Sequence, residues 1–171
     1  AYPKSPRSYL LRNDGKGVFE DVTQAAAPEL THAGMATSAL WTDFDNDQWI
    51  DLVVVGEYMP ITFFRNEGGK KLVRAEEAGL KDSEGWWKSI TAGDFDNDGD
   101  IDYIAGNFGL NTHYRATPAE PINVTFKDFD RNGALEAITS YYEDGVNYPT
   151  ASLDVLTNQL PLLKRKLLYH R

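Results

Sequence analysis

The chain has 171 residues, 42% of them hydrophobic, which is enough to bury one domain-sized core. Its formal net charge of −9 argues against a nucleic-acid partner, and the absence of cysteine excludes disulfides and thiolate metal sites. No apolar run is long enough to cross a membrane.

The first elements expected in chain order form a hairpin. Residues 10–19 predict a short strand, a glycine turn and a second strand. An alanine-rich segment, 25–27, leads into a strand expected at 37–42. The chain then enters loop one, which is D-F-D-N-D-Q-W-I-D at 43–51. Residues 52–55 form an entirely apolar run, which is typical of a buried strand.

Loop two, D-F-D-N-D-G-D-I-D at 94–102, is the most regular acidic stretch. Carboxylates stand at positions one, three, five, seven and nine, and Gly99 at position six allows a sharp bend. The strands expected on either side are 89–93 and 101–105. So many carboxylates in one turn repel one another unless a cation lies among them. Calcium, which takes six to eight oxygen ligands in a flexible shell, fits such a loop.

The pattern recurs in loop three, D-F-D-R-N-G-A-L-E at 128–136, between strands expected at 122–127 and 137–142. Loop two starts 51 positions after loop one, and Asn66 repeats Asn13 of the opening turn 53 positions later. Loop three follows after 34 positions, so this unit is shorter. We therefore expect repeats at about 10–65, 66–115 and 116–150. Short strands with a period of about 50 residues are typical of propeller blades or a β-solenoid.

The last segment, 151–171, is expected to be helical. Leucines follow helical spacing from Leu153 to Leu167, with Ser152 as the N-cap, and Pro161 should kink or divide the helix. The chain starts at Ala1 and stops at Arg171 without a cap or turn signal, so we expect a piece of a longer chain. Open blade edges would then pair with a copy of the chain or with missing blades.

The acidic loops do not fit an EF-hand. An EF-hand needs a bidentate Glu at the twelfth position, where this chain has Val54, Ala105 and Thr139. The ninth-position acid must therefore close the metal shell. The three histidines stand in unrelated contexts without the spacing of a zinc site, so zinc is not expected.

The D-x-D-x-D-G-x-x-D spacing followed by an apolar strand resembles the FG-GAP or VCBS-type repeats of integrin-α-like β-propellers. The stretch 13–23, N-D-G-K-G-V-F-E-D-V-T, is similar to the connecting part of that repeat, and G-N-F-G-L-N at 106–111 resembles secreted bacterial VCBS-repeat proteins. The resemblance implies an all-β fold: a partial β-propeller of about three blades, with Asp-rich calcium loops between strands and a C-terminal helix.

By the same resemblance, calcium would be bound at two or three sites by the side chains at positions one, three, five and nine and by the carbonyl at position seven. Gln48 departs from the pattern in place of a glycine, and Asn132 and Glu136 alter loop three. The implied ligands are Asp43, Asp45, Asp47, Trp49 and Asp51; Asp94, Asp96, Asp98, Asp100 and Asp102; and Asp128, Asp130, Asn132, Ala134 and Glu136.

Two functional hypotheses follow. The first is a non-catalytic module outside the cytoplasm, in which calcium rigidifies the blades and loops face a protein or glycan partner. Weak calcium sites fill in the periplasm, at the cell surface or in the medium. The alternative is part of a calcium-dependent polysaccharide lyase, with Tyr103, His113 and Tyr114 nearest to loop two in sequence.

The four tryptophans allow two interpretations. They would form a platform on which sugars stack, or they would fill the core of a blade. We expect them to fill the core. They are Trp41, Trp49, Trp86 and Trp87.

Overall fold

The computed structural model describes residues 5–78, 80, 82–109 and 112–167, and most of its regular structure is antiparallel β-sheet. The chain divides into two compact units, one made of residues 5–108 and one that contains the chain from Gly109 onward. The all-β fold class is confirmed, and the sheets are compatible with a partial propeller.

The first unit begins with the predicted hairpin. Strand β1 (Leu11–Asn13) pairs with β2 (Phe19–Asp21), and α1 (Thr23–Ala26) and a 3-10 helix (Pro28–His32) follow. The buried Thr23 hydroxyl donates to the Asp21 carboxylate and accepts the backbone N–H of Leu10. The hydroxyl and backbone N–H of Thr23 lower the pKa of Asp21 from its usual value.

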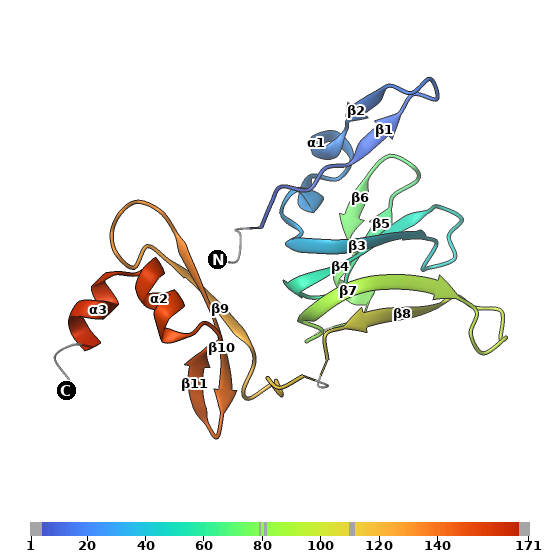
Figure 1. Cartoon of the computed structure of the whole chain (residues 1–171). Coiled ribbons are helices and arrows are strands. Elements are labelled where there is room, and N and C mark those ends of the chain that lie inside the picture. The colour runs from blue at the N-terminus through green and yellow to red at the C-terminus, as the bar shows by residue number, and fades with distance from the viewer. Residues whose placement is uncertain (1–4, 79, 81, 110–111, 168–171) are drawn as a thin grey trace. The chain divides into compact units, whose positions relative to one another are not determined.

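A four-stranded meander forms the centre of this unit. Strands β3 (Met35–Thr42), β4 (Asp51–Met59), β5 (Thr62–Asn66) and β6 (Leu72–Arg74) follow one another in space as in sequence, each antiparallel to the next (Figure 1). Such a sheet is the unit from which propeller blades are built.

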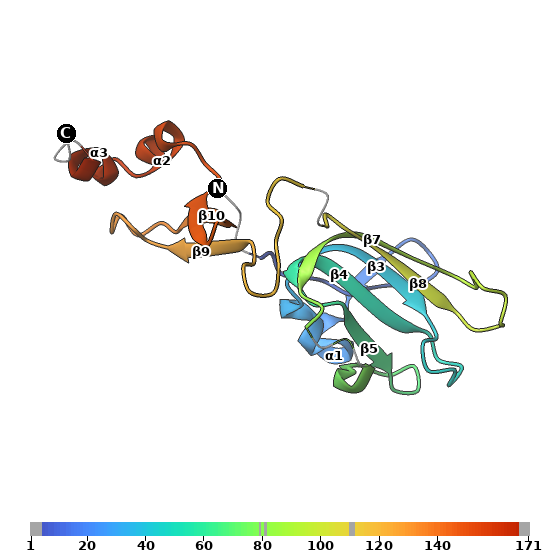
Figure 2. The same ribbon diagram turned by 90° about the horizontal axis from the view of Figure 1, so that it is seen from below.

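The central strand β4 is buried on both faces, as its apolar sequence predicts. On one face Leu52 and Val54 pack with Ala27 and Leu30. The last two belong to the segment around α1, whose place beside the sheet can be followed in Figure 2. On the other face Val53 packs in a separate cluster with residues of β5 and β7. A strand that is covered on both sides needs a continuous apolar run in place of alternation.

A second hairpin lies beside the meander. Strand β7 (Gly85–Gly93) pairs with β8 (Asp102–Asn107), and β7 also pairs with the end of β4 near Glu57. The Thr37 hydroxyl donates to the carbonyl of Trp87, which ties β3 to β7. A one-turn 3-10 helix (Glu76–Ala78) precedes β7.

The second unit consists of a three-stranded sheet and two short helices. Strands β9 (Asn123–Lys127), β10 (Glu136–Glu143) and β11 (Val146–Pro149) form an antiparallel meander, followed by α2 (Leu153–Gln159) and α3 (Leu162–Leu167).

The C-terminal helix is divided at Pro161, as predicted. Ser152 caps α2, with its hydroxyl accepting the N–H of Val155. The predicted continuation to Tyr169 lies outside the described residues, as do Leu110 and Asn111 of the predicted 106–111 motif. No helix in the described part of the chain is long and apolar enough to span a membrane.

Candidate metal sites in the acidic loops

Each acidic loop joins two neighbouring antiparallel strands. Loop one connects β3 to β4, loop two connects β7 to β8, and loop three connects β9 to β10. Within the first unit, loops one and two lie at the same end of the sheet (Figure 1). The strand–loop–strand setting expected from the sequence is confirmed for all three loops.

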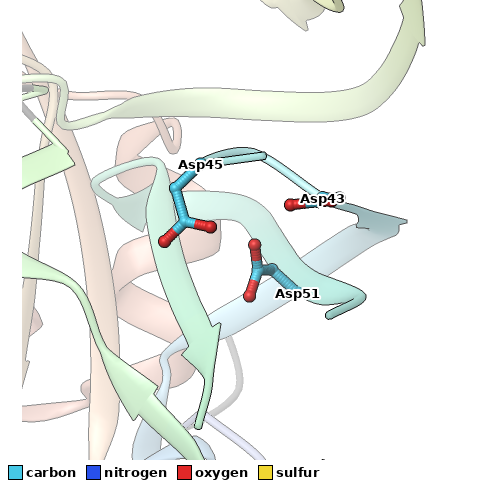
Figure 3. Close-up of side chains that lie close together, drawn as sticks. All are labelled: Asp43, Asp45 and Asp51. Carbon is cyan, nitrogen blue, oxygen red and sulfur yellow. The ribbon is translucent and has the colours of Figure 1, made fainter. Parts of the chain in front are cut away.

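The loops bring the acids of positions one, three and nine together. In each loop these three side chains offer carboxylate oxygens that all lie within 4.8 Å of one another. Figure 3 shows the three carboxylates of loop one around a shared space. The groups are Asp43, Asp45 and Asp51; Asp94, Asp96 and Asp102; and Asp128, Asp130 and Glu136.

The first-position aspartate organises each loop through the backbone. In loop one the two carboxylate oxygens of Asp43 accept the N–H groups of Asp47 and Gln48, at 3.1 and 2.9 Å. Asp94 binds the corresponding N–H groups of loop two at 3.2 and 3.1 Å, and Asp128 does so in loop three at 3.0 Å each. Three stretches of different sequence therefore share one conformation.

The ninth-position acid closes each loop. One carboxylate oxygen accepts the N–H of the second residue: Asp51 from Phe44 at 3.1 Å, and Asp102 and Glu136 from their counterparts at 2.9 Å. Asp51 has no exposed surface, and burial raises its pKa, partly offset by the N–H groups of Asn66 and Phe44. Burial of this kind disfavours the charged form of a carboxyl.

Positions five and seven are arranged differently. The side chains of Asp47, Asp98 and Asn132 accept the N–H of the residue two positions on, so they brace the turn. None of these three belongs to the groups of converging carboxylates. The position-seven residues expected to offer carbonyls, Trp49, Asp100 and Ala134, are the donors of those bonds.

The donor chemistry of the three groups suits a hard cation. Each group presents oxygen ligands alone, and Mg²⁺ and Ca²⁺ are the ions that prefer such ligands in proteins. Two carboxylates 4.8 Å apart repel by about 1 kcal/mol even in water, and the repulsion grows as water is excluded. A divalent ion among the three would remove that repulsion. The residues therefore fit a metal site.

Loop one has a further set of contacts that the sequence analysis missed. Asn66, at the end of β5, donates its backbone N–H to Asp51 at 2.7 Å and its side-chain amide to the carbonyl of Ile50 at 2.8 Å. Its neighbour Arg65 pairs with Asp45, with 2.6 Å between Nε and Oδ2. The sequence does contain a signal that Arg65 and Asn66 belong to a repeated motif, because the same pair, Arg12–Asn13, also precedes a glycine turn.

A family model for FG-GAP-like repeats matches residues 3–54 and 43–105, and each match ends just beyond an acidic loop. The chain belongs to the FG-GAP-like repeat family. Loop three lies outside the matched ranges, yet it repeats the hydrogen bonds of the other two FG-GAP loops. No curated protein matches the chain.

The aromatic residues depart in part from expectation. The expectation that the tryptophans fill a core is wrong for Trp41 and Trp49. Both residues are exposed, Trp41 at 54% and Trp49 at 46%. The reason is position: Trp41 lies on the face of β3 that the described residues of this unit leave open, and Trp49 lies in loop one. Trp86 is partly buried between Tyr58 and Phe108.

The residues named for a lyase are engaged in structural contacts. The Tyr103 hydroxyl shares a 2.8 Å hydrogen bond with Thr42, and its ring packs edge-on against Phe63. His113 and Tyr114 belong to the other unit, where their ring centroids lie 3.9 Å apart with the planes tilted by 46°, and Tyr141 packs beside them. The lyase hypothesis stays a prediction, which ultraviolet absorbance of unsaturated products from uronic-acid polymers would test.

Proposed function

We propose that the chain is a calcium-stabilised propeller module in which two or three of its acidic loops hold structural calcium. The shared hydrogen-bond pattern of the loops carries this proposal. Backbone N–H groups hold the first and ninth acids of every loop in the same places, so that three carboxylates converge at each loop. Bound calcium would neutralise these carboxylates and fix the strands on either side.

Calcium is favoured over magnesium by the form of the loops. Magnesium demands near-octahedral geometry and gives up its water reluctantly, whereas calcium accepts irregular shells of six to eight oxygens. Each loop supplies three converging carboxylates, and backbone N–H groups already hold those at positions one and nine, which suits an irregular shell better than an octahedral one. The implied ion does no chemistry in this proposal, because its role is to neutralise charge.

We further propose that the module acts outside the cytoplasm and binds a protein or glycan through its loops. Extracellular modules bind calcium with dissociation constants of about 10⁻⁴–10⁻³ M, which only calcium-rich compartments satisfy. Exposed apolar side chains in the loops support a binding role. Between 46% and 59% of their surface is exposed, and they are Trp49 and Ile50, Phe95 and Ile101, and Leu135.

The test is a thermal melt in calcium, in magnesium and in chelator, with calorimetric counting of sites. We expect calcium to raise the melting temperature more than magnesium does, with two or three sites per chain. The double variant Asp94→Asn/Asp96→Asn should lose one site and keep the rest. A melting temperature that is the same in calcium and in chelator would refute the proposal.

A further inference from the structure

Arg65 brings a positive charge into loop one. Its side chain extends from the end of β5, and its Nε lies 2.6 Å from Oδ2 of Asp45, with the guanidinium 5.6 Å from the ring centre of Phe44. The two charged side chains are 36% and 24% exposed, so water screens the pair only in part. One of the three converging carboxylates of loop one therefore already has a counter-charge.

The other two loops are built differently at this position. The third-position acids Asp96 and Asp130 accept backbone N–H groups of their own loops, at 3.2 and 3.1 Å. Within the described part of the chain, no ion pair joins a lysine or arginine to a carboxylate of loop two or loop three. A charged side chain from another strand is thus particular to loop one.

We infer that Arg65 is a built-in counter-cation of loop one, which keeps this loop folded without metal and lowers its affinity for calcium below that of loop two. This inference rests on the proposed calcium sites. The charge count supports the order, because loop two has five carboxylates whereas loop one has four and the guanidinium. Fewer net negative charges on the ligands weaken calcium binding.

The size of the effect follows from the charges. A unit charge about 6 Å from a divalent ion in a water-like medium changes the affinity by roughly tenfold. The guanidinium also occupies one oxygen of Asp45 and leaves the other for a metal. Arg65 therefore reduces the affinity of loop one without abolishing the site. In return, the metal-free loop is spared part of the repulsion among its carboxylates.

The chain contains its own matched control for Arg65. Arg12 occupies the same place in the N-terminal R-N-x-G turn, but it pairs across the hairpin with Glu20 at 2.7 Å and both side chains are more than 60% exposed. Among the described residues, no hydrogen bond or ion pair joins it to an acidic loop. Arg12→Met therefore removes the same charge from the chain while leaving loop one untouched.

Trp49 gives a reporter for loop one. It lies in that loop, its ring packs on the turn at Gly69, and loops two and three contain no tryptophan. Terbium bound in loop one would emit through energy transfer from this indole, and calcium competition against terbium gives the calcium affinity of the loop. The measurement uses the full chain with Arg65→Met, Arg65→Lys and Arg12→Met.

We expect Arg65→Met to bind calcium at loop one about tenfold more tightly, with Arg65→Lys and Arg12→Met near the parent. Arg65→Met should also melt lower in chelator, so that its calcium-induced rise in melting temperature widens. A purely structural role for Arg65 would lower melting in both conditions equally and leave the affinity unchanged, which would overturn the inference while the calcium proposal stands. Absence of calcium binding in every variant would overturn both.

Discussion

The sixth position of each acidic loop has a left-handed backbone. Its φ is +73° at Gln48, +95° at Gly99 and +87° at Gly133. A Cβ in this region meets the following carbonyl at a cost of about 1–2 kcal/mol, whereas glycine has no such penalty. At this position loop one therefore carries strain that the other two loops avoid. The backbone N–H groups of Asp47 and Gln48, which donate to the Asp43 carboxylate, hold the loop in place.

Replacing Gln48 by glycine should relieve this strain. We expect Gln48→Gly to stabilise the protein by about 0.5–1 kcal/mol. This figure is the strain that is relieved minus the cost of the greater conformational entropy of glycine in the unfolded chain. Denaturant unfolding in chelator would measure the change. The reciprocal variant Gly99→Gln should destabilise, because a Cβ at Gly99 meets no neighbouring atom and only the backbone conformation opposes it. Changes of the same sign in both variants would contradict this account.

Among the elements, β4 and β5 hold the first unit together. Phe64 of β5 is 1% exposed and packs in the cluster that joins the sheet to the segment around α1. Its removal leaves a cavity that the covered strands cannot close. We expect Phe64→Ala to lower the free energy of unfolding by about 3–5 kcal/mol, as for other buried phenylalanines.

Phe19 of the hairpin gives the matched control for Phe64. It is 60% exposed, so Phe19→Ala should change stability by no more than about 0.5 kcal/mol. Chemical denaturation of both variants in saturating calcium would separate core packing from metal binding. Equal losses in the two variants would show that the buried cluster around Phe64 does not stabilise the unit.

The same elements show what the sequence could and could not predict. The run from Leu52 to Val55 predicted a buried strand, and acids at alternate positions predicted grouped ligands, of which those at positions one, three and nine converge, because both patterns are local. The contact of Arg65 with Asp45 joins residues 20 positions apart on different elements, and no local pattern specifies it. Likewise, Trp41 was expected in a core because its side chain is apolar, whereas its exposure depends on what covers β3.

At the scale of the whole molecule, charge is unevenly distributed. Twelve of the 26 acidic residues lie in the three loops, and the chain carries −9 overall. Three bound divalent ions would bring the charge to −3. The metal-free protein should therefore be destabilised by repulsion within its loops, and the calcium-loaded protein much less so.

Salt should distinguish these two states. At 0.01 M ionic strength charges interact over about 30 Å and at 0.1 M over about 10 Å, so added sodium chloride screens the repulsion among the loop carboxylates. In chelator we expect the melting temperature to rise by about 2–4 °C over this range, which corresponds to roughly 1 kcal/mol for a chain of this size. In saturating calcium the rise should vanish or reverse, because the ions have already neutralised the loops and salt weakens their binding.

The measurement is a set of thermal melts at increasing sodium chloride, each with chelator or with calcium. Potassium chloride should give the same slopes, since screening depends on ionic strength and not on the identity of a monovalent cation. Parallel slopes in chelator and calcium would mean that the acidic loops contribute no repulsion that a metal relieves. If salt raises the melting temperature more steeply in chelator than in calcium, the repulsion that salt screens arises in the acidic loops of this FG-GAP chain. Neutralisation of these loops by metal is then coupled to folding.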